Sequence, residues 1–271
     1  MKISIITPTN NSEKTIIRNA QSIISQTYKN FEHILIDNLS TDNTISYIKN
    51  IYKEAGLSSK LRVISEKDSG ISDAFNKGIH HSEGDLIGIL NSDDYYYNEY
   101  VLEKVVKEFN DENILFVHGN IFFSDSMYGS NLRKPLLCPI TEAMPYNHPA
   151  MFFRKYVYEN YGMFDNSYKY AMDFEFICRL EKIVPGFRDK GKYIGGDALV
   201  FMSAGGKSWE YEIESVKEVE QALQLHKLWN SNAFFSYLFR MVRIEMKKGL
   251  SKLKLNSLVY LWRVNKWDRH K

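Results

Sequence analysis

The sequence predicts an α/β fold in which a mostly parallel sheet carries helices on both faces, followed by a helical C-terminal extension. Over the first 120 residues, short apolar runs alternate with amphipathic helical patterns. The links between them are short, which is typical of parallel strands joined by crossover helices. From residue 209 onward the pattern is helical and almost free of helix breakers.

The apolar runs of the first 120 residues are the expected strands: Ile3–Thr7, Phe31–Asp37, Leu61–Ser65, Leu86–Leu90 and Ile114–His118. Helices are expected at about 13–26, 42–52, 70–80 and 98–109. We expect Ser12 to cap the first helix and Ser40 or Thr41 the second.

The segment 120–208 is less regular because five prolines interrupt it. It predicts helices near 154–160 and 172–183, and strands near 187–193 and 197–202. We therefore divide the chain into a body over 1–208, with halves 1–120 and 121–208, and an extension over 209–271.

The composition limits the class of protein. A chain of 271 residues with 44% hydrophobic residues can build one large domain with an appendage. Cys138 and Cys178 lie forty residues apart, which argues against a disulfide scaffold and a cysteine-rich zinc site. No run reaches the roughly 18 apolar residues of a membrane span. The sequence thus predicts a cytoplasmic protein.

Charge is distributed unevenly. Residues 231–271 hold ten Lys or Arg against two acidic residues, a balance of +8, whereas the other 230 residues hold 25 against 31, a balance of −6. An acidic body with a basic, aromatic tail argues against nucleic-acid binding by the body and suggests two functional zones.

Polar clusters follow the expected strands, where ligands bind in parallel α/β sheets. Residues 7–11, Thr-Pro-Thr-Asn-Asn, could hold a flat polar ligand or form only a turn and a cap. Asp37 ends a buried strand and could accept an imide N–H such as that of uracil. Asp42 is better placed to cap the next helix.

Two further clusters suit a diphosphate and a cation. Within residues 66–78, Gly70 opens a helix whose N-terminus favours phosphate, and the nearby charges face either a diphosphate or solvent. Asp93 and Asp94 follow an apolar strand, where adjacent carboxylates need a compensating cation unless both are solvated.

A last cluster contains residues 147–150 and Asp173, which is expected in the first turn of a helix. A carboxylate there could act as a general base, cap the helix, or do both.

Five motifs in this order resemble family-2 glycosyltransferases, which have a Rossmann-like GT-A type fold. They are the opening at 7–11, the Asp-x-x-Ser-Thr-Asp loop at 37–42, the block at 68–78, Asn-Ser-Asp-Asp at 91–94, and Asp-x-Glu at 173–175. The resemblance covers about residues 1–208. The third motif further resembles enzymes that build bacterial O-antigen, capsule and colanic acid.

The resemblance implies an inverting transfer from a UDP-sugar donor, bound by the first half of the body, to a glycan acceptor that we expect to be lipid-linked. Asp173 would be the catalytic base, with Glu175 as a rival because Met172 replaces the usual Glu. Mn²⁺ or Mg²⁺ would bind Asp93, together with Asp94 or His148, since Asn91 replaces the usual first Asp. The implied donor-binding residues are Pro8, Thr9, Asn11, Asp37, Asp68, Asp73, Asn76, Asn91 and Ser92.

Residues 204–208 resemble the loop that closes over the donor in related enzymes. Two other classes of protein stay open. A nucleotidyltransferase that makes a nucleotide-sugar would usually open with a Gly-rich phosphate loop, and residues 7–11 contain no Gly. A non-catalytic membrane-binding scaffold would use the basic tail.

In that tail, Leu255, Leu258, Val259 and Trp262 follow helical spacing, with Trp267 one turn further and basic residues alongside. This stripe could bind an anionic membrane, the protein's own body or a second subunit. The +8 balance favours peripheral membrane binding through about residues 233–271, at the inner face of the cell membrane. A homo-oligomer is the other possibility.

Overall fold

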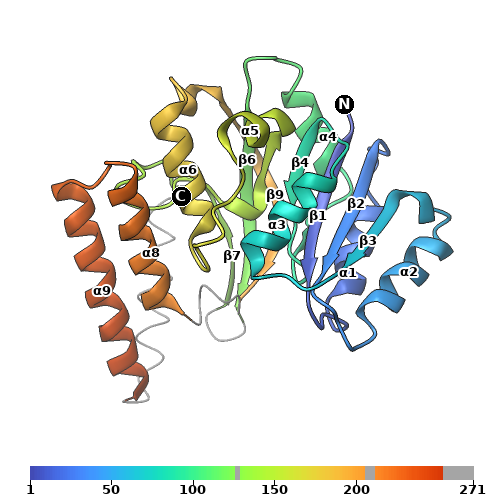
Figure 1. Cartoon of the computed structure of the whole chain (residues 1–271), viewed down its shortest axis with the longest axis horizontal. Coiled ribbons are helices and arrows are strands. Elements are labelled where there is room, and N and C mark those ends of the chain that lie inside the picture. The colour runs from blue at the N-terminus through green and yellow to red at the C-terminus, as the bar shows by residue number, and fades with distance from the viewer. Residues whose placement is uncertain (126–128, 205–210, 253–271) are drawn as a thin grey trace.

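The computed structural model describes residues 1–125, 129–204 and 211–252 (Figure 1). These residues form a nine-stranded sheet in the order β3-β2-β1-β4-β8-β6-β9-β5, with β7 paired to β6. The first four of these strands are mutually parallel, and β8 then pairs antiparallel with both β4 and β6. The predicted α/β class and mostly parallel sheet are confirmed.

The strands are β1 Ile3–Thr9, β2 Phe31–Asp37, β3 Leu61–Ser65, β4 Leu86–Ile89, β5 Tyr95–Tyr96, β6 Phe116–Asp125, β7 Gly129–Arg133, β8 Met151–Arg154 and β9 Gly191–Ser203. The helices are α1 Ile16–Ile24, α2 Thr44–Glu54, α3 Ile71–His81, α4 Val101–Glu108, α5 Lys155–Tyr161, α6 Met172–Ile183, α8 Glu212–Leu225 and α9 Ser231–Lys252. Short 3₁₀ turns occur at Ser58–Lys60, His148–Ala150 and Phe187–Lys190.

Two local predictions were wrong. Ser12 does not cap α1 with its side chain: the helix begins at Ile16, and the Ser12 hydroxyl lies 2.9 Å from that of Ser92. Neither Ser40 nor Thr41 caps α2, because Asp42 accepts the Thr44 N–H at 3.0 Å instead.

The two strands expected between 187 and 202 are one strand, β9. It runs parallel to β6, and the register shifts around Gly119 and Asn120. Residues 195–197, Gly-Gly-Asp, lie at this irregularity, and the strand begins at Gly191 because Phe187–Lys190 form a 3₁₀ turn.

Side chains alternate along β1, so that the two faces of the sheet are covered by different helices. Ile5 belongs to an apolar cluster with α4, and Ile6 to one with α3, α5 and α6. α3 lies very close to β1, since a Cβ at Gly78 would meet the Ile6 side chain at 2.2 Å.

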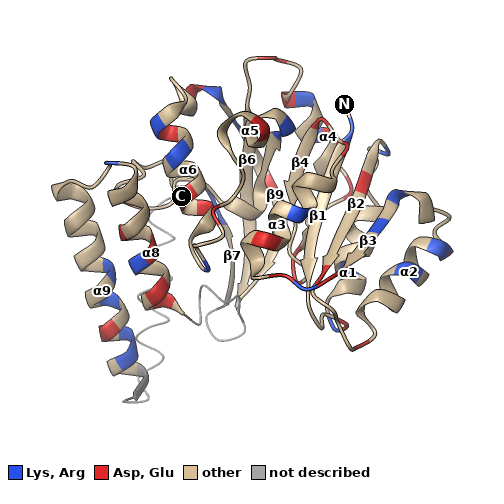
Figure 2. Ribbon diagram, in the orientation of Figure 1, with Lys and Arg blue, Asp and Glu red and all other residues tan. Residues whose placement is uncertain are grey.

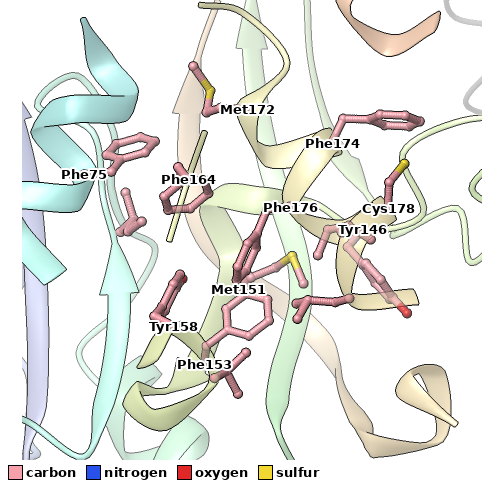
Figure 3. Close-up of a cluster of buried hydrophobic side chains, with 14 of the residues drawn as sticks. Phe75, Tyr146, Met151, Phe153, Tyr158, Phe164, Met172, Phe174, Phe176 and Cys178 are labelled. Carbon is pink, nitrogen blue, oxygen red and sulfur yellow. The ribbon is translucent and has the colours of Figure 1, made fainter. Parts of the chain in front are cut away.

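The larger apolar cluster joins α3 to α6. Figure 3 shows Phe164 between Phe75 of α3 and Phe176 of α6, and both ring pairs are in contact, with centroids 5.3 and 5.0 Å apart. Aromatic packing of this kind fixes the relative position of the two helices that carry the polar clusters.

The C-terminal helices begin by packing on the body. Val219 and Leu223 of α8 belong to the same buried cluster as Phe174 of α6, whereas α9 lies outermost (Figure 1). A division at residue 208 is therefore not a division of the core. None of the described helices is long and apolar enough to cross a membrane.

Candidate active site

The carboxyl ends of β1, β2 and β3 bring polar residues into one row. Thr9 pairs with Asp37 across β1 and β2, and Asp37 pairs with Ser65 across β2 and β3. The motifs after the first three strands thus meet at one sheet edge, as the parallel topology requires.

Asp37 is fully buried and only half satisfied. Its Oδ2 accepts hydrogen bonds from the Ser65 hydroxyl at 2.6 Å and the Ser40 N–H at 3.1 Å. Its Oδ1 has no hydrogen-bond partner among the described residues, and neither has the buried hydroxyl of Thr9. Because buried polar atoms are rarely left unpaired, these two atoms point to a ligand with polar hydrogen.

The loop after β1 is tied to the loop after β2. Asn11 has a positive φ of 51°, its N–H donates to the Ser40 hydroxyl at 2.8 Å, and its Oδ1 accepts the Thr41 N–H at 2.9 Å. Pro8 is buried within β1, opposite Ile36. Asn11 therefore holds the two loops together through both its backbone N–H and its side chain.

The block before and within α3 is largely occupied by the protein's own contacts. Asp68 accepts the Gly70 N–H at 3.0 Å. Asp73 accepts the Ser69 N–H at 2.9 Å, which together with Lys77 keeps the pKa of Asp73 below its usual value despite partial burial. Asp73 thus holds the helix start.

Asn76 holds two segments together. Its Nδ2 donates to the Phe164 carbonyl at 2.8 Å, and its Oδ1 accepts the Phe164 N–H at 3.0 Å. Asn76 therefore fixes the segment at Phe164 against α3, and donor contacts of Asp73 and Asn76 stay a prediction.

The loop after β4 is held by a side chain of α1. Asn19, buried in α1, donates to the carbonyls of Asn91 and Asp94 at 2.9 and 3.0 Å. Asn19 is not among the site residues predicted from the sequence, although an asparagine on the apolar face of a helix, beside Ala20 and Ile23, is a usable signal.

The two adjacent carboxylates differ. Asp94 is 2% exposed and accepts the Ser203 N–H at 3.3 Å and the Asn91 amide at 3.4 Å. Burial raises its pKa well above the usual value, and the Asp93 charge adds to this effect. Asp93 is less buried, yet burial also raises its pKa, and no cation pairs with it in the described chain.

The expected metal ligands do not gather. The described ranges contain no group of three or more His, Cys, Asp or Glu side chains arranged to hold a metal. Asp94 points into protein contacts, and His148 packs between Phe75 and Phe164. Asp93 is the remaining candidate, and its uncompensated, partly buried carboxylate suits a hard cation that draws its other oxygen ligands from a diphosphate and water.

Asp173 and Glu175 share the first turn of α6 but have different surroundings. Asp173 is partly exposed, and its negative charge favours protonation of His148, although burial still leaves the pKa of His148 below its usual value. Glu175 is 2% exposed and ion-paired with Arg179 at 3.1 Å and His226 at 2.8 Å. The Asp173 Oδ1 accepts the Phe174 N–H at 2.8 Å, and Asp173 is the more exposed of these two carboxylates.

The family model described as Glycosyl transferase family 2 matches residues 4–179, about two thirds of the chain. The chain belongs to this family. The matched residues span every polar cluster of the sheet edge and both carboxylates in the first turn of α6.

Family-2 relatives with recorded sequences include an uncharacterised glycosyltransferase of Haemophilus influenzae, 31% identical over 199 residues, which cover 67% of this chain and 60% of the relative. A chondroitin synthase of Escherichia coli is 27% identical over 68% of this chain and 27% of its own length. The chain thus spans 60% or less of these relatives.

Solved structures share the family-2 fold. S. aureus TarS 1–349 in complex with UDP-GlcNAc superposes with a TM-score of 0.64 at 21% identity, over 83% of this chain and 65% of that one. Mannosyltransferase PcManGT from Pyrobaculum calidifontis, in complex with GDP-Man and Mn²⁺, gives 0.63 at 14% identity, over 96% and 80%. The GT-A type fold expected from the motifs is confirmed.

Proposed function

We propose that this chain transfers a sugar from a UDP-sugar donor to a glycan acceptor, with inversion, in the synthesis of a bacterial surface polysaccharide. The observation that carries the proposal is the pair of buried, unpaired oxygens on Asp37 and Thr9 at the end of the parallel strands. A uracil N–H and a neighbouring polar hydrogen would satisfy them.

The solved structures support a nucleotide-sugar donor. The TarS structures are described with UDP and UDP-GlcNAc, and PcManGT with GDP-Man and Mn²⁺. Chondroitin synthases of Escherichia coli and Pasteurella multocida are relatives that build polysaccharide. The acceptor we propose is a glycan linked to lipid.

Asp93 would hold Mn²⁺ or Mg²⁺. A bound divalent ion would supply charge stabilisation to the departing diphosphate. Asp94 then has a supporting role: it fixes the loop by binding the Ser203 N–H, while the Ser203 hydroxyl lies 3.3 Å from the Asp93 carbonyl. Two further residues of this loop would contact the donor. The Ser92 hydroxyl lies 2.9 Å from that of Ser12, and the buried Oδ1 of Asn91 has no hydrogen-bond partner among the described residues.

Asp173 would act as the general base. Its carboxylate takes the proton from an acceptor hydroxyl, whose oxygen forms a bond to the anomeric carbon. The bond from that carbon to the diphosphate breaks, and its electron pair leaves with UDP. One displacement from the opposite face inverts the configuration.

We further propose peripheral binding to an anionic membrane through residues 233–271. Six apolar side chains of α9 are 46–64% exposed on one side of the helix: Phe234, Phe235, Leu238, Phe239, Val242 and Met246. We call these six the α9 apolar face. The stripe from Leu255 to Trp267, like the loop 205–208, lies outside the described residues. Apolar side chains beside an excess of basic residues favour a membrane interface.

A donor screen tests the proposed activity. UDP-Glc, UDP-Gal, UDP-GlcNAc and UDP-GalNAc are incubated with the protein and Mn²⁺ or Mg²⁺, and released UDP is measured, with GDP-Man as a comparison. We expect metal-dependent UDP release from one of the four. Pyrophosphate release from UTP and a sugar 1-phosphate, without UDP release, would instead identify a nucleotidyltransferase.

A further inference from the structure

We propose that Glu218 of α8 is a positioning residue for Asp173, acting by fixing the first turn of α6. The inference rests on the proposed function, in which Asp173 is the general base. It adds a residue from outside the segment that the family model matches, which ends at 179.

The first observation is a set of three hydrogen bonds between Glu218 and the backbone before α6. The Glu218 carboxylate accepts the N–H of Lys169 on one oxygen at 2.9 Å, and those of Tyr170 and Ala171 on the other, both at 2.8 Å. These three residues lead directly into α6, which begins at Met172. One side chain thus binds every backbone donor of the approach to the helix.

The N-cap residue of α6 provides no side-chain cap. Ala171 occupies the N-cap position and has no side chain able to accept a hydrogen bond, whereas within the first turn Asp173 accepts the Phe174 N–H at 2.8 Å. The N-terminus of a helix exposes unpaired N–H groups, of which Glu218 accepts that of Ala171, and a partial positive charge that a nearby carboxylate offsets. Here that carboxylate comes from a residue 47 positions later in the chain.

A second contact between the same two helices is independent of the first. His226, which follows α8 directly, lies 2.8 Å from the Glu175 carboxylate in the first turn of α6. Arg179 pairs with the same carboxylate and also donates to the carbonyls of Tyr161 and Met163. Glu175, the rival base, therefore belongs to the support of α6.

These contacts matter for Asp173, which lies two residues after Ala171. Its carboxylate can move only as far as the backbone of this turn allows, and the turn is held by Glu218 before it and by Glu175 after it. A displacement of about 1 Å at a reacting group can cost on the order of 100-fold in rate. Glu218 would therefore influence turnover without touching the substrate.

The test is Glu218→Gln, which keeps the size of the side chain but replaces one accepting oxygen by an N–H donor. We expect kcat for the active UDP-sugar to fall about 10- to 100-fold, while KM for the donor and Kd for UDP stay within about twofold. Hydrogen exchange of the amides at 169–171 should become faster. Glu214→Gln is the matched control, because Glu214 is exposed on the same helix.

Coupling to the base is measured in the Asp173→Asn background. There Glu218→Gln should cause no further loss of the residual rate, because the group that it positions is absent. Glu218→Asp, which retains both oxygens, should recover part of the rate, and it replaces Glu218→Gln in every assay if the latter does not fold.

An unchanged kcat, unchanged exchange at 169–171, or an equal loss with and without the Asp173 carboxylate would overturn the inference. Failure of the proposed function has a different signature: the unmodified protein would release UDP from none of the four donors, while the exchange of these amides could still be compared.

Discussion

Asp93 is the residue whose proposed role depends most on a bound divalent cation. Burial raises its pKa, and no cation in the described chain compensates its charge. We expect Asp93→Ala to lower transfer at least about 100-fold, since the leaving diphosphate would lose its charge stabilisation. Chelation with EDTA should do the same and be reversed by Mn²⁺. Asp197→Ala, an exposed aspartate of β9, serves as the control.

The prediction is checked by measuring UDP release with the donor that is active in the screen. Circular dichroism checks the fold of both variants. Full activity of the unmodified protein in excess chelator would contradict it.

Asp173 and Glu175 can be separated by substitution. Asp173→Asn should lose about 10²- to 10⁴-fold in kcat while UDP binding and thermal stability stay unchanged. Glu175→Gln breaks a buried ion-paired network with Arg179 and His226, so we expect a large loss of stability, on the order of 3 kcal/mol. Steady-state kinetics and urea unfolding distinguish the two. A stable but inactive Glu175→Gln beside an active Asp173→Asn would reverse the assignment.

The positions of single residues were predictable where one strand end or one helix start decides them. Asp37 lies at a strand end, Asp93 in the loop after a strand and Asp173 in the first turn of a helix, as the sequence predicts, and their roles remain proposals. The hydrogen bonds of Asp94 and Asn76 could not be predicted, because their partners, Ser203 and Phe164, lie 109 and 88 residues away. No local pattern contains such a pairing.

Among the elements, α3 shows how close two can approach. A methyl group at Gly78 would meet Ile6 of β1 at 2.2 Å, so Gly78→Ala forces the helix away from the sheet. We expect a loss of about 1–3 kcal/mol in the free energy of unfolding. Gly249→Ala in α9, where no atom lies within 4 Å of the added carbon, should be neutral or stabilising. Urea unfolding of both measures the difference, and equal effects would contradict the close contact.

α9 has an exposed apolar face, and at least one of its basic residues is bound to α8. The α9 apolar face is exposed, whereas Lys247 pairs with Glu212 of α8 at 2.7 Å, and Figure 2 shows basic residues of α9 beside acidic residues of α8. We expect the double variant Phe235→Ser, Phe239→Ser to reduce co-sedimentation with anionic vesicles at low salt several-fold.

Leu225→Ser is the control for this experiment, because Leu225 is equally exposed but lies on α8. Equal pelleting of the variant and the unmodified chain, or pelleting of neither, would count against membrane binding.

The sequence pattern was sufficient to predict most elements, because α1 to α6 each bury one regular face and β1, β2 and β4 are largely apolar runs buried on both faces. It failed at β9, where residues 195–197 interrupt the alternation at a register shift that only the partner strand β6 explains. It also failed at Ser12, whose hydroxyl pairs with Ser92 across the sheet edge.

For the whole molecule, the dependence of the unfolding free energy on pH shows how strongly the buried core resists a charged histidine. His33 is buried between Tyr52 and Thr7, and burial lowers its pKa to about 3. Since an unfolded histidine titrates near 6.5, the stability that neutral His33 contributes is complete above that pH and is lost as the pH falls toward 3.

We therefore expect His33→Gln to flatten the dependence of unfolding free energy on pH between 6 and 4.5 by about 1.4 kcal/mol per pH unit. Urea unfolding at several pH values measures the slope, with the exposed His80→Gln as control. Parallel curves for His33→Gln and the unmodified protein would contradict this account.

We predicted a boundary between the body and the extension at residue 208, because the hydrophobic pattern becomes uniformly helical there. That change of pattern does not mark a change of packing, since an amphipathic helix such as α8 can bury its apolar face against any neighbour. Val219 and Leu223 bury theirs against the body.

The cap that α8 places on α6 limits how this protein can be recombined. A chimaera that joined residues 1–208 to the C-terminal helices of another glycosyltransferase would keep the sheet edge proposed to bind the nucleotide. Asp173, the proposed base, would then lie on a helix that had lost its hydrogen bonds to α8. Swaps intended to change the acceptor should therefore join the two chains after His226, so that the proposed donor site and the support of Asp173 stay together.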